Sequence, residues 1–335
     1  MRLVTERAPR APARPAAAAA AIEPLDIFIW HVHGSWMTAF VQGPHRYYVP
    51  LLPDRGPDGR GRAQTWDWPS SVVEVTPEQA RALHVDVVIM QRPHELDVLV
   101  ERWLGRAPGR DVRAIYLEHN APEGAIAEMR HVAADRPDLE IVHVTHFNAL
   151  FYDGGSTPSR VIEHGIVDPG YRYTGELQRA AVVINEAQRR GRVTGTDLLP
   201  RFERALPIDV FGMGAGERGG FENLRQSQLH AEIPRRRVYL HPVRWTSLGL
   251  ALIEAMQLGM PVVALATTEV VAAVPPDAGF IATDVDRLCD ALRDLAGDPG
   301  RSRAMGEAAR AFALERYGLD AFLRAWDACL AEVHV

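Results

Sequence analysis

The sequence predicts an α/β protein made of two successive doubly wound halves. Short, fully apolar strand candidates alternate with helix candidates along most of the chain. This alternation is typical of parallel sheets that are covered by helices on both faces. At 335 residues the chain is long enough for two domains with separate cores.

Composition excludes several classes of function. The formal net charge of −6 argues against a general nucleic-acid binder, and no apolar run is long enough for a transmembrane segment. All 37 basic residues are arginines. A chain without lysine cannot carry a Walker-A loop, a protein-kinase lysine or a pyridoxal-phosphate Schiff base. Cys289 and Cys329 fall in predicted helices, which indicates reduced core thiols and a cytoplasmic location.

The first half begins after an Ala/Pro/Arg tail, residues 1–24, that predicts disorder. Residues 26–32 form a predicted strand, and His33, Gly34 and Ser35 turn the chain into a helix at 37–42. Ligand contacts in such a half are expected at the carboxyl ends of strands, so these three turn residues are candidate cleft residues. Residues 52–70 are a long Pro/Gly/Arg loop. Further predicted elements are a helix at 77–83, a strand at 85–90, a helix at 94–104, a strand at 114–117 followed by another helix, and a strand at 140–144.

Histidines are concentrated in the first half, where ten of thirteen lie before residue 165. His31 and His33 share one strand face, but no third ligand follows at metal-binding spacing, so no metal site is predicted. His119 ends a strand and is either a cleft residue or a core histidine bonded to a carbonyl.

Residues 238–269 are the most informative stretch of the second half. They predict a strand, a polar loop, a helix at 250–258 that is stopped by Gly259 and Pro261, and a second strand. We expect an N-cap just before this helix, and an anion site where the N–H groups of Ser247, Leu248, Gly249 and Leu250 meet the helix dipole; these four residues are candidates for donor binding. Glu254 is either a hydrogen-bonding partner for a sugar hydroxyl or a solvated helix residue.

This stretch resembles a known signature. Thr246-Ser-Leu-Gly-Leu-Ala-Leu-Ile-Glu254-Ala-Met, followed by Gly259-Met-Pro-Val-Val-Ala, is similar to the donor-binding motif of the retaining GT-B glycosyltransferases of group 1, or family 4. The resemblance implies the GT-B fold, two Rossmann-like domains that face each other across a cleft. It also implies transfer of a sugar from a nucleotide-diphosphate sugar, with retention of configuration and with neither a metal nor another cofactor.

The resemblance also assigns residues. Glu254 matches the glutamate that holds the nucleotide ribose, whereas Thr246 stands where the family has a glutamate that touches the donor sugar. His119 occupies the place of a histidine near the transferred sugar, so His119 and Thr246 are the candidate catalytic residues. The remaining donor-binding candidates are Arg189, Arg190 and Arg192, which lie opposite the diphosphate, and Gly212 and Gly214, which lie near the base.

Residues 160–169 look like the family's interdomain linker. The expected domains are therefore an acceptor-side domain at 25–168, a nucleotide-sugar-binding domain at 169–316, and a C-terminal helix at 317–335 that crosses back to the first domain.

Two alternatives to transfer remain open at this stage. Thr246 brings no charge, so the protein is either a transferase or a GT-B-like protein that binds a nucleotide sugar without transferring it. A sugar-nucleotide epimerase would need cleft carboxylates, for which the first half offers Glu118 and Glu163. The acceptor, whether polysaccharide, lipid-linked or a small molecule, is not determined, and peripheral association with the inner membrane face stays open.

Overall fold

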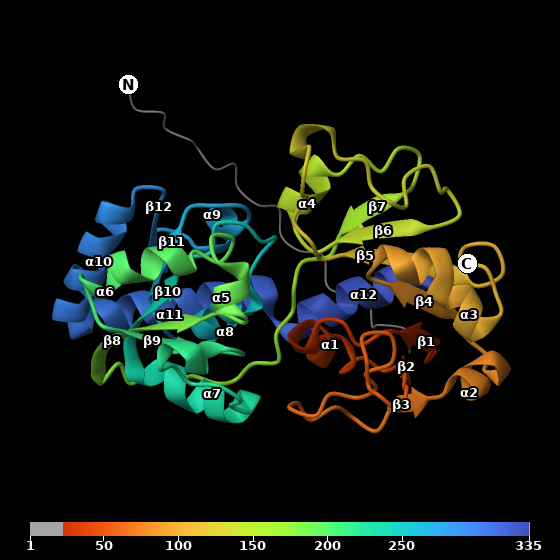
Figure 1. Cartoon of the computed structure of the whole chain (residues 1–335), viewed down its shortest axis with the longest axis horizontal. Coiled ribbons are helices and arrows are strands. Elements are labelled where there is room, and N and C mark those ends of the chain that lie inside the picture. The colour runs from red at the N-terminus through yellow and green to blue at the C-terminus, as the bar shows by residue number, and fades with distance from the viewer. Residues whose placement is uncertain (1–22, 335) are drawn as a thin grey trace, which may run out of the picture.

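The computed structural model describes residues 23–334 and shows two α/β halves lying side by side (Figure 1). Each half contains one parallel sheet, so the predicted class of two doubly wound halves is confirmed. Residues 1–22, most of the predicted disordered tail, lie outside the described residues, as does Val335. No described helix is both long and apolar enough to cross a membrane.

The first half is a sheet of seven strands in the order β3-β2-β1-β4-β5-β6-β7. The order reverses between β1 and β4, and ligands of such sheets bind at the carboxyl ends beside this reversal. The strands are β1 (Asp26–Ile29), β2 (Arg46–Pro50), β3 (Val72–Val75), β4 (Val87–Met90), β5 (Arg113–Glu118), β6 (Glu140–His143) and β7 (Ser159–Val161). The helical segments are α1 (Gly34–Phe40), α2 (Pro77–Ala82), the π-helix η1 (Glu95–Leu99), α3 (Val100–Leu104), the 3₁₀ turn η2 (Ile126–Glu128) and α4 (His146–Phe151).

The first half differs from the sequence prediction in two respects. Strands β2, β3 and β7 are not evident from the sequence, because each is short and carries polar residues or proline; their parallel partners supply the hydrogen bonds that make them strands. The helix expected after β5 is wrong. Only the single turn η2 forms there, because Pro122 lacks an N–H group and Gly124 adopts a left-handed φ of +80°.

The second half is a sheet of five strands in the order β12-β11-β10-β8-β9. Its strands are β8 (Leu177–Val183), β9 (Ile208–Phe211), β10 (Arg236–His241), β11 (Val262–Leu265) and β12 (Gly279–Ala282). Its helices are α5 (Ala187–Arg190), α6 (Leu199–Glu203), α7 (Gln226–Glu232), α8 (Leu250–Gln257), α9 (Val270–Ala273), α10 (Val285–Gly297) and α11 (Pro299–Tyr317), with 3₁₀ turns η3 (Thr196–Leu198), η4 (Ala215–Arg218) and η5 (Ile233–Arg235). Here the order reverses between β10 and β8, which places the loops after these two strands beside each other.

Helix α12 (Leu319–His334) belongs to the second half in sequence but packs on the first half (Figure 1). Its Phe322 and Trp326 join the core that lies under α1, where the rings of Trp36 and Trp326 meet edge to face at 5.6 Å. Gly165, in the segment that connects the two sheets, lies against Phe322 so closely that a Cβ there would come within 2.3 Å of that side chain. The two halves are therefore joined by packing as well as by the connecting segment.

Candidate functional site

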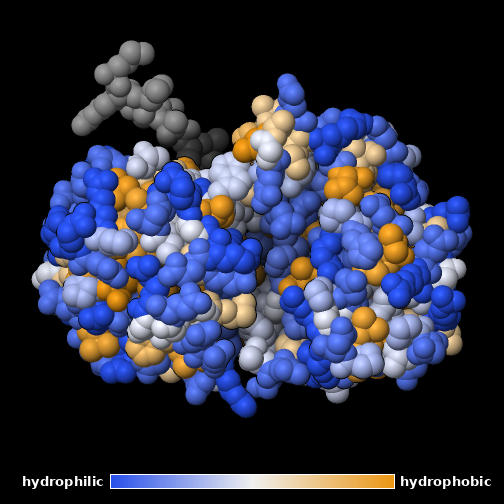
Figure 2. Space-filling model, in the orientation of Figure 1, coloured by the Kyte–Doolittle hydropathy of each residue, from blue (hydrophilic) through white to orange (hydrophobic). Residues whose placement is uncertain are grey.

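The loop between β10 and α8 contacts the first half directly. Figure 2 shows a hollow between the two lobes, which we call the interdomain cleft. Ser247, part of the N-cap segment in the sequence prediction, does not cap α8. Gly249 is the N-cap, and the Ser247 hydroxyl instead donates to the backbone carbonyl of His119 at 2.7 Å. The Trp245 indole N–H likewise donates to the carbonyl of Pro122 at 2.9 Å. The capping prediction was wrong because the Ser247 hydroxyl finds its acceptor, the carbonyl of His119, in the other half of the molecule, which the local sequence does not reveal.

The amino end of α8 presents free backbone donors. Within residues 23–334, the N–H groups of Leu248, Gly249, Leu250 and Ala251 have no hydrogen-bond partner. Gly249 also brings the backbone unusually close to its surroundings, because a Cβ there would lie 2.7 Å from Cε1 of His241. A helix start with unpaired N–H groups and a bare Cα is suited to an anion.

Glu254 lies on the second turn of α8 and is not solvated, so the interpretation as a surface residue is wrong. Its side chain is buried at 4% exposure and carries donors on both oxygens. Ser35, from α1 of the first half, donates to Oε1 at 2.6 Å. The Gln226 amide donates to Oε2 at 2.7 Å, and His230 Nε2 lies 3.2 Å from the same oxygen. The carboxylate is thus held from both halves at once.

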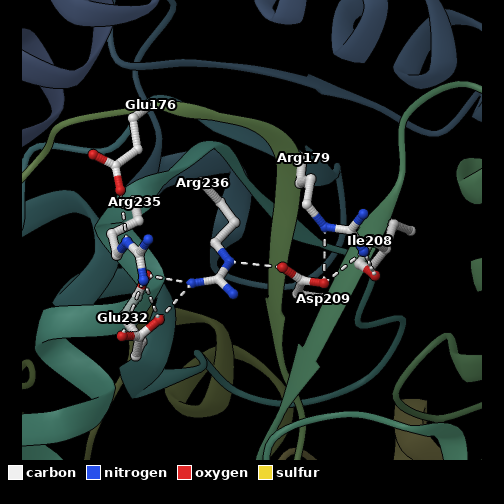
Figure 3. A network of polar contacts seen from close by, with 7 residues as sticks. All are labelled: Glu176, Arg179, Ile208, Asp209, Glu232, Arg235 and Arg236. Atoms are coloured by element: carbon white, nitrogen blue, oxygen red, sulfur yellow. Dashed lines mark hydrogen bonds and ion pairs between the residues drawn. The ribbon is translucent and has the colours of Figure 1, made fainter.

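Helix α7, which carries Gln226 and His230, is fixed by a network of ion pairs (Figure 3). Buried Arg236 donates to Asp209 at 2.8 Å and to both the carbonyl and the carboxylate of Glu232, the last residue of α7. Arg179 binds the other oxygen of Asp209 at 2.6 Å. A buried guanidinium with acceptors on two elements ties α7 to strands β9 and β10.

Three histidines from the first half gather at the cleft. The rings of His33 and His119 are 4.3 Å apart, and His119 stacks on His164 at 6.4 Å. Burial lowers the pKa of His33 to about 4 and that of His164 to about 3, and it lowers the pKa of His119 as well. These rings are therefore neutral at physiological pH. His119 is buried, and its Nε2 lies 3.1 Å from the side-chain amide oxygen of Gln91, which is buried as well.

The loop with the candidate arginines lies against the β10–α8 loop. The backbone N–H groups of Arg244 and Trp245 both donate to the carbonyl of Val193, at 2.9 and 3.2 Å. Gly195 makes this approach possible, since a Cβ at that position would lie 1.9 Å from the carbonyl oxygen of Pro242.

The three arginines are not equivalent. Exposed Arg189 pairs with Glu186, and exposed Arg192 pairs with Asp197. Arg190 is half-buried, and among the described residues its guanidinium has no hydrogen-bond or ion-pair partner. Burial, followed by the nearby charge of Arg189, lowers the pKa of Arg190. An unpaired and partly desolvated guanidinium favours an incoming anion.

Gly212 and Gly214 form a tight loop after β9. Gly212 has a φ of +128°, and a Cβ there would lie 2.4 Å from the carbonyl oxygen of Ile184, so only glycine fits. The Gly214 N–H donates to Glu222 at 2.8 Å, and the N–H of Met213 donates to the Asn185 side chain at 3.0 Å. The loop is thereby held in one conformation.

The two carboxylates that an epimerase would need are already engaged. Glu118 accepts from the Asn120 N–H at 2.7 Å and lies 3.2 Å from His131. Glu163 is bound by Arg316 at 2.5 Å. Thr246, partly exposed in the β10–α8 loop, makes no side-chain hydrogen bond among the described residues.

Metal-ligand atoms approach one another at a different place. In the described part of the chain, Asp26, His84 and Asp86 are the one group whose potential ligand atoms lie within 4.8 Å of each other. Asp26 begins β1, and Asp86 directly precedes β4, so the group lies at the amino edge of the first sheet, opposite the cleft. Asp26 is also paired with Arg46 at 3.4 Å.

Sequence reasoning did not find Gln226, His230, Gln91 or Glu222. The first two lie in residues 216–236, which have little periodic pattern, yet their spacing of four places both on one face of a helix. That spacing was the available signal. Gln91 and Glu222 have no such signal in the sequence. The partner of Gln91 is His119, which is distant in sequence, and the partner of Glu222 is the N–H of Gly214, which lies in a loop.

Comparison with known proteins identifies this architecture. Residues 221–312 match the family model described as glycosyl transferases group 1, a range that contains the β10–α8 loop and Glu254. The predicted resemblance is therefore confirmed over this part of the second half. A GDP-mannose-dependent monoacylated α-(1-6)-phosphatidylinositol monomannoside mannosyltransferase from Corynebacterium glutamicum is 31% identical over 143 residues, which cover 42% of this chain and 31% of that protein. The chain thus aligns with about a third of this curated relative.

Solved structures resemble the chain over most of its length. Sucrose-phosphate synthase from Thermosynechococcus elongatus has a TM-score of 0.69 at 12% identity, covering 92% of this chain and 99% of that one. HepE from Anabaena, in complex with UDP, has a TM-score of 0.65 at 14% identity, covering 92% and 100%. These likenesses confirm the predicted GT-B fold.

Proposed function

We propose that the protein is a glycosyltransferase that moves a sugar from a nucleoside-diphosphate sugar to an acceptor. The observation that carries this proposal is the junction of Glu254 and the unpaired amino end of α8 with the strand-end residues of the first half. This junction brings together an acceptor for the ribose hydroxyls, a binding site for the diphosphate, and first-half residues that would face the reacting sugar. The match of residues 221–312 to the glycosyltransferase model supports the same reading.

The donor would be held in three parts. Its diphosphate would accept from the N–H groups of Leu248–Ala251 and from Arg190, and its ribose would donate to Glu254. Its base would lie on the glycine loop at 212–214, where Met213 is 56% exposed. The leaving diphosphate gains charge during transfer, and fixed donors aimed at it are typically the largest contribution to catalysis.

His119 and Thr246 would face the transferred sugar from the two sides of the cleft. Because burial keeps the pKa of His119 low, its ring would act as a neutral hydrogen-bonding group and not as a positive charge. In line with the resemblance, we propose retention of configuration without a metal or a further cofactor.

Arg190 is predicted to be the phosphate contact among the three loop arginines. Arg190→Ala should weaken nucleoside-diphosphate binding by about 10-fold, since it removes a charge-assisted hydrogen bond from an unpaired guanidinium. Arg189→Ala and Arg192→Ala are the matched controls, because those side chains are already paired and exposed. Titration calorimetry of the three variants tests this assignment. An equal loss of nucleotide affinity in all three variants, or no loss in Arg190→Ala, would contradict it.

Binding without transfer is the second candidate, and Thr246 favours it. Where the family motif places a carboxylate near the donor sugar, this chain has a hydroxyl that brings no charge to the cleft.

A nucleotide panel followed by a turnover assay tests the proposed function. GDP, UDP, ADP and dTDP, with their sugar forms, are screened by thermal shift, which rises with RT ln(1 + [L]/Kd). GDP-mannose is the first donor to test, because the Corynebacterium relative is named for it. Stabilisation by one nucleotide and release of that nucleotide with an acceptor support the transferase. Stabilisation with no turnover supports the binding protein, and no stabilisation by any nucleotide would reject both.

A further inference from the structure

The contact between Ser35 and Glu254 joins the two halves at the proposed ribose site. The Ser35 hydroxyl donates to Glu254 Oε1 at 2.6 Å, whereas Oε2 is occupied by Gln226 and His230 of the second half itself. The carboxylate oxygen that Ser35 holds is thus the one that the second half leaves open.

Ser35 offers Glu254 the same chemical group that a ribose would offer. A carboxylate has about four lone-pair sites: the Ser35 hydroxyl fills one on Oε1, and the Gln226 amide fills one on Oε2, with His230 Nε2 3.2 Å from the same oxygen. A serine hydroxyl and a ribose hydroxyl are both neutral O–H donors of similar strength. Because Glu254 is only 4% exposed and Ser35 covers Oε1 from the first half, a ribose hydroxyl that reaches this oxygen takes the place of the Ser35 hydroxyl.

The backbone that carries Ser35 cannot retreat easily. Trp36, the next residue of α1, is fully buried and packs edge to face on Phe322 and Trp326 of α12, at 6.0 and 5.6 Å. On the other side, Gly34 lies so close to Trp66 that a Cβ would come within 2.5 Å of its ring. The core of the first half therefore holds the backbone of Ser35 in place, so its hydroxyl leaves Glu254 by rotation of the side chain or by separation of the two halves.

We propose that Ser35 is a built-in competitor of the nucleotide, an autoinhibitory contact that occupies the ribose-binding carboxylate until a ribose hydroxyl displaces it. This inference rests on the proposed function, since it assumes that a nucleotide binds at Glu254. Displacement of Ser35 breaks a hydrogen bond between the two halves, so nucleotide binding is coupled to loosening of the cleft.

The proposal predicts that Ser35→Ala raises the affinity for the nucleotide although it removes a hydrogen bond from the site. In the free variant, Oε1 of buried Glu254 loses its donor, which destabilises the free protein. A ribose hydroxyl then restores the missing hydrogen bond without having to displace anything. The variant should therefore be less stable alone and bind the nucleotide more tightly, whereas a Ser35 that merely supported the site would leave binding weaker when removed.

Titration calorimetry on the full chain tests this with two forms of one nucleotide. The probes are the nucleoside diphosphate that stabilises the wild type in the panel above and its 2′,3′-dideoxy form, which has no hydroxyl to replace the serine. Ser35→Ala should bind the ribonucleotide about 10-fold more tightly than the wild type and the dideoxynucleotide equally well.

Thr38→Ala is the matched control. Thr38 lies one turn further along α1, and its hydroxyl contacts Gly34 and Trp68 but not Glu254, so its loss should lower the melting temperature without tightening nucleotide binding. Unchanged or weaker ribonucleotide binding by Ser35→Ala would overturn the inference and leave the proposed function standing. An equal gain in affinity for the dideoxynucleotide would also overturn the inference, because the gain would then not depend on the ribose hydroxyls. Binding to neither protein would overturn the proposed function and this inference together.

Discussion

Glu254→Ala is expected to weaken the binding of a nucleoside diphosphate by about 10- to 100-fold. A hydrogen bond to a charged group contributes about 1.5–3 kcal/mol, and the ribose would lose its carboxylate acceptor. The side chains of Gln226 and His230 would at the same time lose the carboxylate oxygen that they share. This variant and Ser35→Ala, which each remove one side of the same hydrogen bond, should therefore shift affinity in opposite directions.

Calorimetric titration at fixed salt measures the effect. Glu254→Gln keeps the shape of the side chain and one acceptor oxygen, so this variant should lose less nucleotide affinity than Glu254→Ala. Glu307→Ala, which removes an exposed glutamate from α11, is the control and should bind as the wild type does. If Glu254→Ala bound the nucleotide with wild-type affinity, the ribose assignment would be wrong.

Acidification is expected to destabilise the protein through two buried histidines, His164 and His241. Both are 3% exposed, and both ring nitrogens of each lack a hydrogen-bond partner within the described chain. Burial lowers the pKa of His164 to about 3, with a smaller effect from His33, and burial alone lowers that of His241 to about 4.

The sign follows from proton linkage. In the unfolded chain a histidine has a pKa of about 6.5, so between that pH and its folded pKa the unfolded state binds more protons. Stability due to each ring is therefore fully present above about pH 6.5 and is lost as the pH falls toward its folded value. When the pH falls from 7.5 to 5, each histidine should lower the free energy of unfolding by about 2 kcal/mol.

Urea unfolding at these two pH values checks the prediction. The stability difference between pH 7.5 and pH 5 should shrink by about 2 kcal/mol in His164→Gln and in His241→Gln. His146→Gln, which replaces an exposed histidine, should leave it unchanged. If His164→Gln and His241→Gln showed the same stability difference between pH 7.5 and pH 5 as the wild type, these rings would not stay neutral in the folded protein.

Much of the fold was predictable because it depends on local patterns. Strands such as β4 and β11 are apolar at every position, and a residue pattern of that kind needs no distant partner to be recognised. Gly259 ends α8 with a φ of +90°, as its place before Pro261 predicts. Strands such as β2 and β7 have no such pattern and exist only because β1 and β6 lie beside them.

The candidate site was predictable residue by residue but not in its contacts. The sequence placed Ser35, His119 and Ser247 at strand ends and at a helix start, which are the positions where ligands bind in such folds, and it placed Glu254 inside the helix that follows. It did not show that Ser35 bonds to Glu254 or that Ser247 bonds to His119, because 219 and 128 residues separate these pairs.

The sequence by itself determined which residues end strands, start helices and carry the glycosyltransferase signature, since these depend on neighbours a few positions away. Only the tertiary structure decided that Glu254 is buried and already bonded, and that Arg190 is the loop arginine whose guanidinium has no hydrogen-bond partner among residues 23–334. The physical reason is the same in both cases. Whether a charged side chain is paired depends on which groups the packing of distant segments brings within about 3 Å, and local propensity carries no information about that distance.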